Sequence, residues 1–122
     1  MIEFSAEAKR RYDNIVSHYP EKRAALVPVL TLAQREFGWI SPEVAEYVGS
    51  LMGYPASDVL SVATFYTMLH KKPAGNHHME LCRNVSCWLM GTYACLDEIK
   101  RVLKVEAGQV TTDGKFSFAL TE

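Results

Sequence analysis

The chain has 122 residues, a formal net charge of −1, and a composition that is 48% hydrophobic and 22% charged. These values suit one soluble globular domain or two small packed pieces. They argue against nucleic acid as the main ligand, because phosphate binding favours a clustered basic surface. No apolar run approaches the roughly 18 residues of a membrane span, and the N-terminus lacks the pattern of a signal peptide. The three cysteines do not suggest a disulfide framework, and a reducing cytoplasm is the expected compartment.

The first part of the chain carries helix signals at regular intervals. Ser5 is expected to cap a first helix, which Pro20 interrupts. A second helix carries its apolar positions from Ala25 onward and ends at Gly38. Pro28 should either kink this helix or mark the start of its regular part.

Two further helices are predicted before the composition changes. The run Ser41-Pro42-Glu43 supplies a capping hydroxyl, a proline in the first turn and an acid near the positive end of the dipole, and the helix should stop at Gly53. Pro55 opens a fourth helix whose apolar positions extend to Leu69. Because each amphipathic stripe must be buried against a neighbour, residues 1–74 are predicted to form an N-terminal four-helix bundle.

The remaining residues read as part of an α/β layer. After the loop 71–76, the short run His77–Cys82 is predicted to be a strand. A helical pattern returns at Trp88 and continues to Leu103. The pair Asp113-Gly114 predicts a hairpin turn, followed by a strand with one buried face. The fold class is therefore α+β, with residues 75–122 forming a second domain.

Two cysteines carry the main chemical signal. Cys82 falls at the end of the predicted strand, and Cys87 lies in the loop that leads to the next helix. The C-x4-C spacing is wide for a zinc knuckle and does not match a C-x-x-C redox motif. It is compatible with two thiolates on one iron of a [2Fe-2S] cluster, where the helix N-terminus expected at Trp88 would favour the thiolate charge. The spacing alone also leaves open two ordinary cysteines, one buried and one in a loop.

The other candidate groups are assigned to packing. Cys95 lies on the predicted helix roughly 12 Å along its axis from Cys87, and is expected to be a buried small hydrophobic residue. The pair His77-His78 is interpreted as strand-edge histidines without a metal, because adjacent strand residues alternate sides. Trp88 and the Phe65-Tyr66 pair are expected in the core.

A longer stretch carries a family resemblance. The run V-A-T-F-Y-T-M-L-H-K-K-P-A-G-N-H-H-M-E-L-C-R-N-V-S-C-W-L-M-G resembles the family of the 24-kDa [2Fe-2S] subunit of respiratory complex I, NADH-quinone oxidoreductase. The upstream run L-T-L-A-Q-R-E-F-G-W-I-S-P-E and the downstream run T-T-D-G-K-F-S-F resemble the same family in the expected order. The resemblance extends from about Tyr12 to Glu122.

The resemblance implies a fold and a ligand set. The family has an N-terminal helical bundle followed by a thioredoxin-like domain that holds a [2Fe-2S] cluster. Its first cysteine pair corresponds to Cys82 and Cys87, which makes these two residues the expected cluster and metal ligands. Its second pair, a C-x3-C, would begin just after Glu122, so an incomplete thioredoxin-like domain with two of four ligands is expected here. No catalytic residue is expected.

The resemblance also implies a function and partners. The chain would be an electron-transfer subunit of complex I, with FMN and NADH bound on a partner, the 51-kDa flavin subunit. It would lie in the peripheral arm on the cytoplasmic side of the inner membrane. Three alternatives stay open: the equivalent subunit of a flavin-linked, NAD-dependent hydrogenase or formate dehydrogenase; a cluster-free helical interaction module or scaffold half of the subunit; and a thioredoxin-like thiol enzyme, which the cysteine spacing disfavours.

Overall fold

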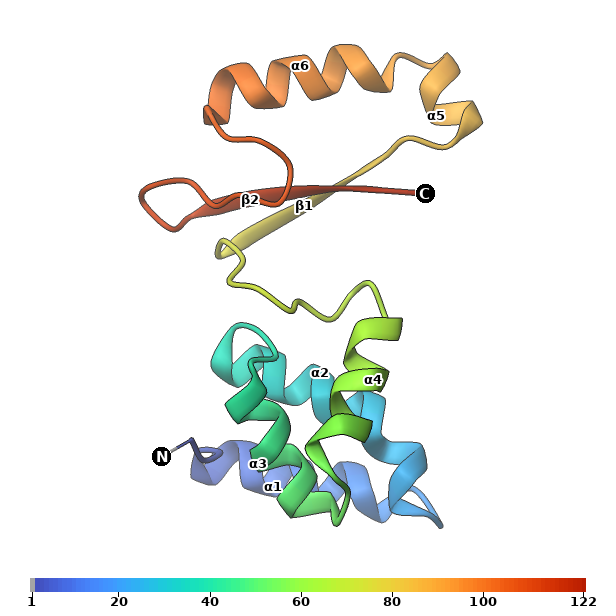
Figure 1. Cartoon of the computed structure of the whole chain (residues 1–122), viewed down its shortest axis with the longest axis vertical. Helices are drawn as coiled ribbons and strands as arrows, with labels where there is room; N and C mark the ends of the chain where they lie inside the picture. The colour runs from blue at the N-terminus through green and yellow to red at the C-terminus, as the bar shows by residue number, and fades with distance from the viewer. Residues whose placement is uncertain (1) are drawn as a thin grey trace. The chain divides into compact units, whose positions relative to one another are not determined.

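The computed structural model describes residues 2–122, which divide into two compact units (Figure 1). The first unit ends at Pro73 and the second is Ala74–Glu122. The first unit is helical, with α1 (Ala6–Ser17), a 3₁₀ helix η1 (Lys22–Ala25), α2 (Leu26–Phe37), α3 (Pro42–Met52) and α4 (Ala56–Phe65). The second unit is mixed, with β1 (His77–Cys82), α5 (Val85–Leu89), α6 (Thr92–Leu103) and β2 (Phe116–Thr121).

The ends of the helices follow local sequence chemistry. The Ser5 and Ser41 hydroxyls accept hydrogen bonds from the backbone N–H groups of Ala8 and Val44, both at 3.2 Å. Each bond satisfies a donor that has no partner inside its helix. Gly53 ends α3 in the left-handed region, with φ of 78°. Pro28 lies in the first turn of α2, so the prediction that it marks the start of the regular helix is confirmed.

The core of the first unit is built from the apolar stripes of its helices. The residues that are least exposed, at 0–1%, include Val29 and Leu30 of α2, Val48 of α3 and Val59 of α4. The helices therefore bury their stripes against one another, as amphipathic patterning requires. The described residues combine helices with a two-stranded sheet, which confirms a mixed fold. The finer expectation of a four-helix bundle stays a prediction.

The fourth helix is shorter than the sequence predicts. It ends at Phe65, and Leu69 lies in the following loop although it is only 1% exposed. The loop is held by long-range hydrogen bonds: the Gln34 side chain donates to the Met68 carbonyl at 3.0 Å, and the Ile40 N–H donates to the His70 carbonyl at 2.8 Å. Leu69 is therefore buried in the core although it is not part of α4.

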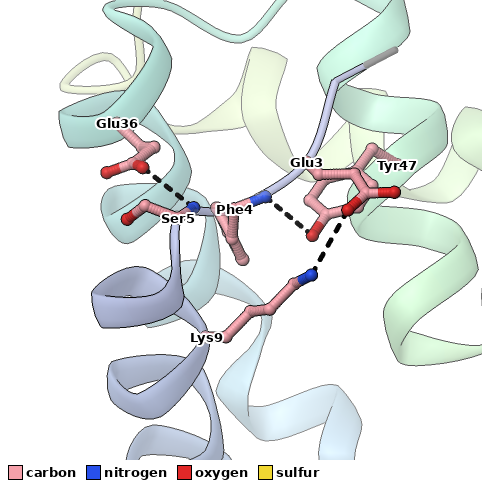
Figure 2. Close-up of polar contacts among 6 residues, drawn as sticks. All are labelled: Glu3, Phe4, Ser5, Lys9, Glu36 and Tyr47. Atoms are coloured by element: carbon pink, nitrogen blue, oxygen red, sulfur yellow. Dashed lines mark hydrogen bonds and ion pairs between the residues drawn. The ribbon is translucent and has the colours of Figure 1, made fainter.

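Phe4 and Ser5 form hydrogen bonds to side chains of α3 and α2 (Figure 2). The Phe4 N–H donates to the Tyr47 hydroxyl at 2.9 Å, and the Ser5 N–H donates to a Glu36 carboxylate oxygen at 3.1 Å. Hydrogen bonds from Ser5 lower the pKa of Glu36. The Phe4 ring stacks on Phe37 with centroids 5.6 Å apart. Phe4 and Ser5 are thus part of the first unit's packing.

The second unit is organised by a parallel strand pair. β1 pairs with β2 in a register that runs from His77↔Phe116 to Cys82↔Thr121. A parallel pair needs a long crossover, and the segment with α5 and α6 supplies it. Helix α6 lies along the sheet (Figure 1), and Phe118 of β2 and Leu96 of α6 are both buried.

The predicted hairpin before β2 is only partly formed. The turn is present, with Gly114 at φ of 73° and its N–H donating to the Thr111 carbonyl at 2.8 Å. Antiparallel pairing, however, consists of an isolated bridge between Val110 and Ser117. The correction has a topological cause: β2 forms its ladder with β1, a choice that local turn signals do not encode. Among the described residues, no helix combines the length and the hydropathy needed to cross a bilayer.

We predict that Ser41→Ala lowers the free energy of unfolding by about 1 kcal/mol, the typical cost of losing an N-cap. Ser41 is 6% exposed, and water cannot easily replace its hydroxyl at the start of α3. Urea denaturation followed by circular dichroism measures the effect. The matched control is Ser50→Ala, which removes an exposed hydroxyl within α3. Equal midpoints for the two variants would contradict the capping role.

Candidate metal centre

The first thiol of the candidate site stands at the end of a strand. Cys82 is the last residue of β1 and is half-buried. It pairs in register with Thr121, and the next residue, Arg83, donates its N–H to the Thr121 carbonyl at 2.9 Å. The strand ladder therefore fixes the backbone on both sides of this cysteine.

The second thiol lies in a short helix and not in a loop, which corrects the sequence prediction. Cys87 is the central residue of α5. The helix begins because the Asn84 side chain accepts a hydrogen bond from the Val85 N–H at 2.8 Å. It ends because Gly91 adopts φ of 98°, after which α6 starts at Thr92. The single helix predicted from Trp88 is thus two helices with a glycine break between them.

The two thiols act on each other electrostatically. Interaction with the Cys82 thiol, followed by desolvation, raises the pKa of Cys87. Two neighbouring thiols present a pair of soft ligands to one metal ion. The spacing that the sequence singled out is therefore a spatial pair.

Cys95 is exposed, so the expectation that it is a buried hydrophobic residue was wrong. It lies near the start of α6. Within residues 2–122, no group of three or more His, Cys, Asp or Glu side chains is arranged to hold a metal ion.

The two histidines of β1 take part in packing contacts of the second unit. The His77 ring lies against Phe116, with centroids 5.4 Å apart. The Nδ1 atom of His78 lies 2.8 Å from the Ser117 hydroxyl, which also accepts a hydrogen bond from the Gly75 N–H at 2.8 Å.

A surface next to Cys87 is unusually apolar. Trp88 and Phe65 were expected in the core, but Trp88 is 55% exposed and Phe65, in the first unit, is 78% exposed. Around Cys87 the exposed apolar residues form what we call the α5 surface: Val85 (67%), Trp88 (55%), Leu89 (71%), Met90 (87%) and Tyr93 (52%). The signal available in the sequence was the run from Asn84 to Leu96, which contains no charged residue. Exposed apolar patches of this kind mark binding surfaces.

One residue of the site was missed by the sequence analysis. The Thr92 hydroxyl donates a hydrogen bond to the Cys82 carbonyl at 2.8 Å, and Thr92 is 6% exposed. Its place in the apolar stripe of the predicted helix was the available signal, because a buried hydroxyl requires a hydrogen-bond partner.

Comparison with known proteins decides the family. The family model of the thioredoxin-like [2Fe-2S] ferredoxins matches residues 12–122. The chain belongs to this family. The resemblance noted from the cysteine-bearing stretch is therefore confirmed.

The chain is similar in sequence to several curated proteins. Three of them are E subunits of NADH-quinone oxidoreductase. The one numbered 2 in Rhizobium meliloti is 39% identical over 106 residues, which cover 87% of this chain and 63% of the relative. The one from Pseudomonas aeruginosa is 36% identical over 100 residues, 82% of this chain and 60% of the relative. The one from Escherichia coli K12 is 32% identical over 120 residues, 98% of this chain and 72% of the relative. The chain thus spans about three fifths of the first two relatives.

The family name implies a [2Fe-2S] cluster. The chain has the right kind of ligand for it, cysteine thiols, but its described residues bring together only two of the four that such a cluster needs. A [2Fe-2S] ferredoxin cluster is held by four thiolates. Cys82 and Cys87 provide two interacting thiols, while the described residues hold no group of three or more metal-binding side chains. This donor set matches two ligands of a single iron.

We predict that Cys82→Ala lowers the pKa of Cys87 toward the ordinary thiol value, because it removes the neighbouring thiol that raises that pKa. More of Cys87 is then thiolate at about pH 8, and its alkylation by iodoacetamide becomes faster. Peptide mass spectrometry over a range of pH measures the midpoint. Cys95→Ala serves as the control and should leave the Cys87 profile unchanged. A midpoint in Cys82→Ala at or above that of the unsubstituted chain would refute the interaction of the two thiols.

Proposed function

We propose that this chain is an electron-transfer subunit of an NADH-quinone oxidoreductase, the complex I type of assembly, and carries a [2Fe-2S] cluster on Cys82 and Cys87. The observation that carries the proposal is the placement of the two thiols, with Cys82 at the end of β1 and Cys87 in α5 shortly after it, where the Cys82 thiol raises the pKa of Cys87. Membership of the thioredoxin-like [2Fe-2S] ferredoxins and the names of the relatives support it. When bound, such a cluster accepts and donates single electrons.

In this proposal the chain's own residues hold the cluster and shape its surroundings. Cys82 and Cys87 supply thiolates to one iron, and two thiolates from outside the described residues complete the set. The hydrogen bonds and burial around the sulfurs set the reduction potential, and the chain supplies no acid, base or nucleophile. We propose residues 1–74 as a helical bundle and residues 75–122 as the thioredoxin-like domain that holds the cluster.

The α5 surface supports a protein partner. Its five residues are more than half exposed and lie within six positions of Cys87 in the chain, so a partner that covers α5 also shields Cys87 from water. We assign this partner as the FMN-bearing, NADH-oxidising subunit of the 51-kDa type. The assembly then places the chain in the peripheral arm, on the cytoplasmic side of the inner membrane.

The experiment is recovery of the tagged chain from the organism that encodes it, followed by assays of the eluate. We expect stoichiometric FMN by fluorescence and oxidation of NADH with ferricyanide as acceptor. Recovery of the chain without flavin or NADH oxidation would contradict the assignment. Turnover of a hydrogenase or formate dehydrogenase substrate by the same eluate would place the chain in one of those related complexes instead.

We further predict that the double substitution Leu89→Ser with Met90→Ser reduces the recovered FMN at least tenfold, because it removes apolar contact area at the proposed interface. Both residues are exposed, at 71% and 87%, so the fold is expected to persist. Val102→Ser on α6, where the valine is 58% exposed, is the matched control and should leave recovery unchanged. Equal loss of FMN in the control would locate the interface elsewhere.

A further inference from the structure

The backbone of Cys82 faces the open edge of β1. In the parallel ladder the N–H groups of His77 and Arg83 donate to Lys115 and Thr121, at 2.7 and 2.9 Å. Polar groups alternate along a strand, so an even-numbered residue such as Cys82 directs its N–H and C=O away from β2. The Cys82 carbonyl therefore needs a partner from outside the strand pair.

That partner is the Thr92 hydroxyl, at 2.8 Å from the Cys82 carbonyl oxygen. Thr92 is the first residue of α6 and follows Gly91, whose φ of 98° turns the chain between α5 and α6. With 6% exposure, Thr92 is shielded from water, and its branched side chain has few alternative rotamers. The bond thus joins a rigid helix start to the end of a rigid strand.

The bond closes the segment that carries both thiols. Cys82 and Thr92 are ten residues apart in the chain, and Cys87 lies midway between them. A closed segment of this length has far fewer conformations than an open one. The position of Cys87 relative to Cys82 depends on that restriction.

We propose that Thr92 is a positioning residue for the Cys82–Cys87 pair: its hydroxyl closes the segment 82–92 and holds the Cys82 backbone in the orientation that directs its thiol toward Cys87. The proposal rests on the proposed function only for the identity of what the pair binds. It concerns the preorganisation of the thiols, which exists whether or not a cluster is bound.

The test measures how closely the folded chain holds the two sulfurs. Each full-length variant, in a Cys95→Ser background, is equilibrated with oxidised and reduced glutathione. The Cys82 and Cys87 thiols become a disulfide while one oxidised glutathione becomes two glutathione thiols, and the equilibrium gives the effective concentration of one thiol at the other. The disulfide fixes the segment between the cysteines in the oxidised chain. A substitution that makes this segment more flexible in the reduced chain therefore lowers the effective concentration.

Three substitutions separate positioning from stability. Thr92→Val keeps the shape and removes the hydroxyl, and we expect it to lower the effective concentration roughly three- to tenfold, the effect of losing one hydrogen bond. Thr92→Ser restores the hydroxyl and should restore the value. Thr111→Val removes a hydroxyl that hydrogen-bonds to Asp113 elsewhere in the second unit, and should leave the value unchanged.

An effective concentration in Thr92→Val equal to that of the parent would overturn the proposal, even if urea denaturation shows a loss of stability, since that result indicates a structural role alone. A loss in Thr92→Ser as large as in Thr92→Val would also overturn it. If Thr92→Val does not fold, Thr92→Ala provides the same comparison. Failure of the proposed function leaves these values unaffected, because no cluster or partner enters the measurement.

Discussion

Two thiols can bind one metal ion only if the fold holds their sulfurs side by side. In this protein the end of β1 positions the first thiol and the start of α5 positions the second. Cys82 is fixed by the ladder with β2, and Cys87 is fixed by α5, which begins at Val85, shortly after the strand ends. The Cys82 thiol raises the pKa of Cys87, so the two elements bring the thiols near enough to interact. A displacement of either element would separate the sulfurs.

The rest of the second unit maintains this geometry. The parallel pairing of β1 with β2 requires a crossover, and the crossover is the segment that contains Cys87 and α6. Leu96 of α6 and Phe118 of β2 are both buried, while α5 buries none of its residues. The part of the crossover nearest the thiols is therefore the part left apolar and uncovered, as a binding surface would be.

Local chemistry made much of the fold predictable. The run Ser41-Pro42-Glu43 encodes the start of α3 and Gly53 its end, because capping and left-handed backbone act over a few residues. The strand His77–Cys82 was likewise predicted with its observed bounds. Non-local choices were not predictable. Leu69 is buried in a loop held by bonds to residues about thirty positions earlier in the chain, and β2 pairs with β1 instead of completing a hairpin.

The candidate site was likewise predicted in part. Spacing and resemblance identified Cys82 and Cys87, but their interaction depends on where α5 starts, which a single Asn84 cap decides. The exposure of Trp88 and Cys95 depends on which faces the small sheet leaves uncovered, and periodicity carries no such information. The role of the two cysteines as cluster ligands stays a prediction.

Cluster binding by Cys82 and Cys87 is tested by the iron and acid-labile sulfide content of the chain after anaerobic reconstitution, together with its visible absorption spectrum. Excess glutathione in the mixture supplies the two thiolates that complete a four-thiolate set. We predict iron and sulfide bound in equal amounts, lost in Cys82→Ala and in Cys87→Ala and retained in Cys95→Ala. A chain that binds no iron under these conditions, or whose iron content is unchanged in Cys82→Ala and Cys87→Ala, would contradict this prediction.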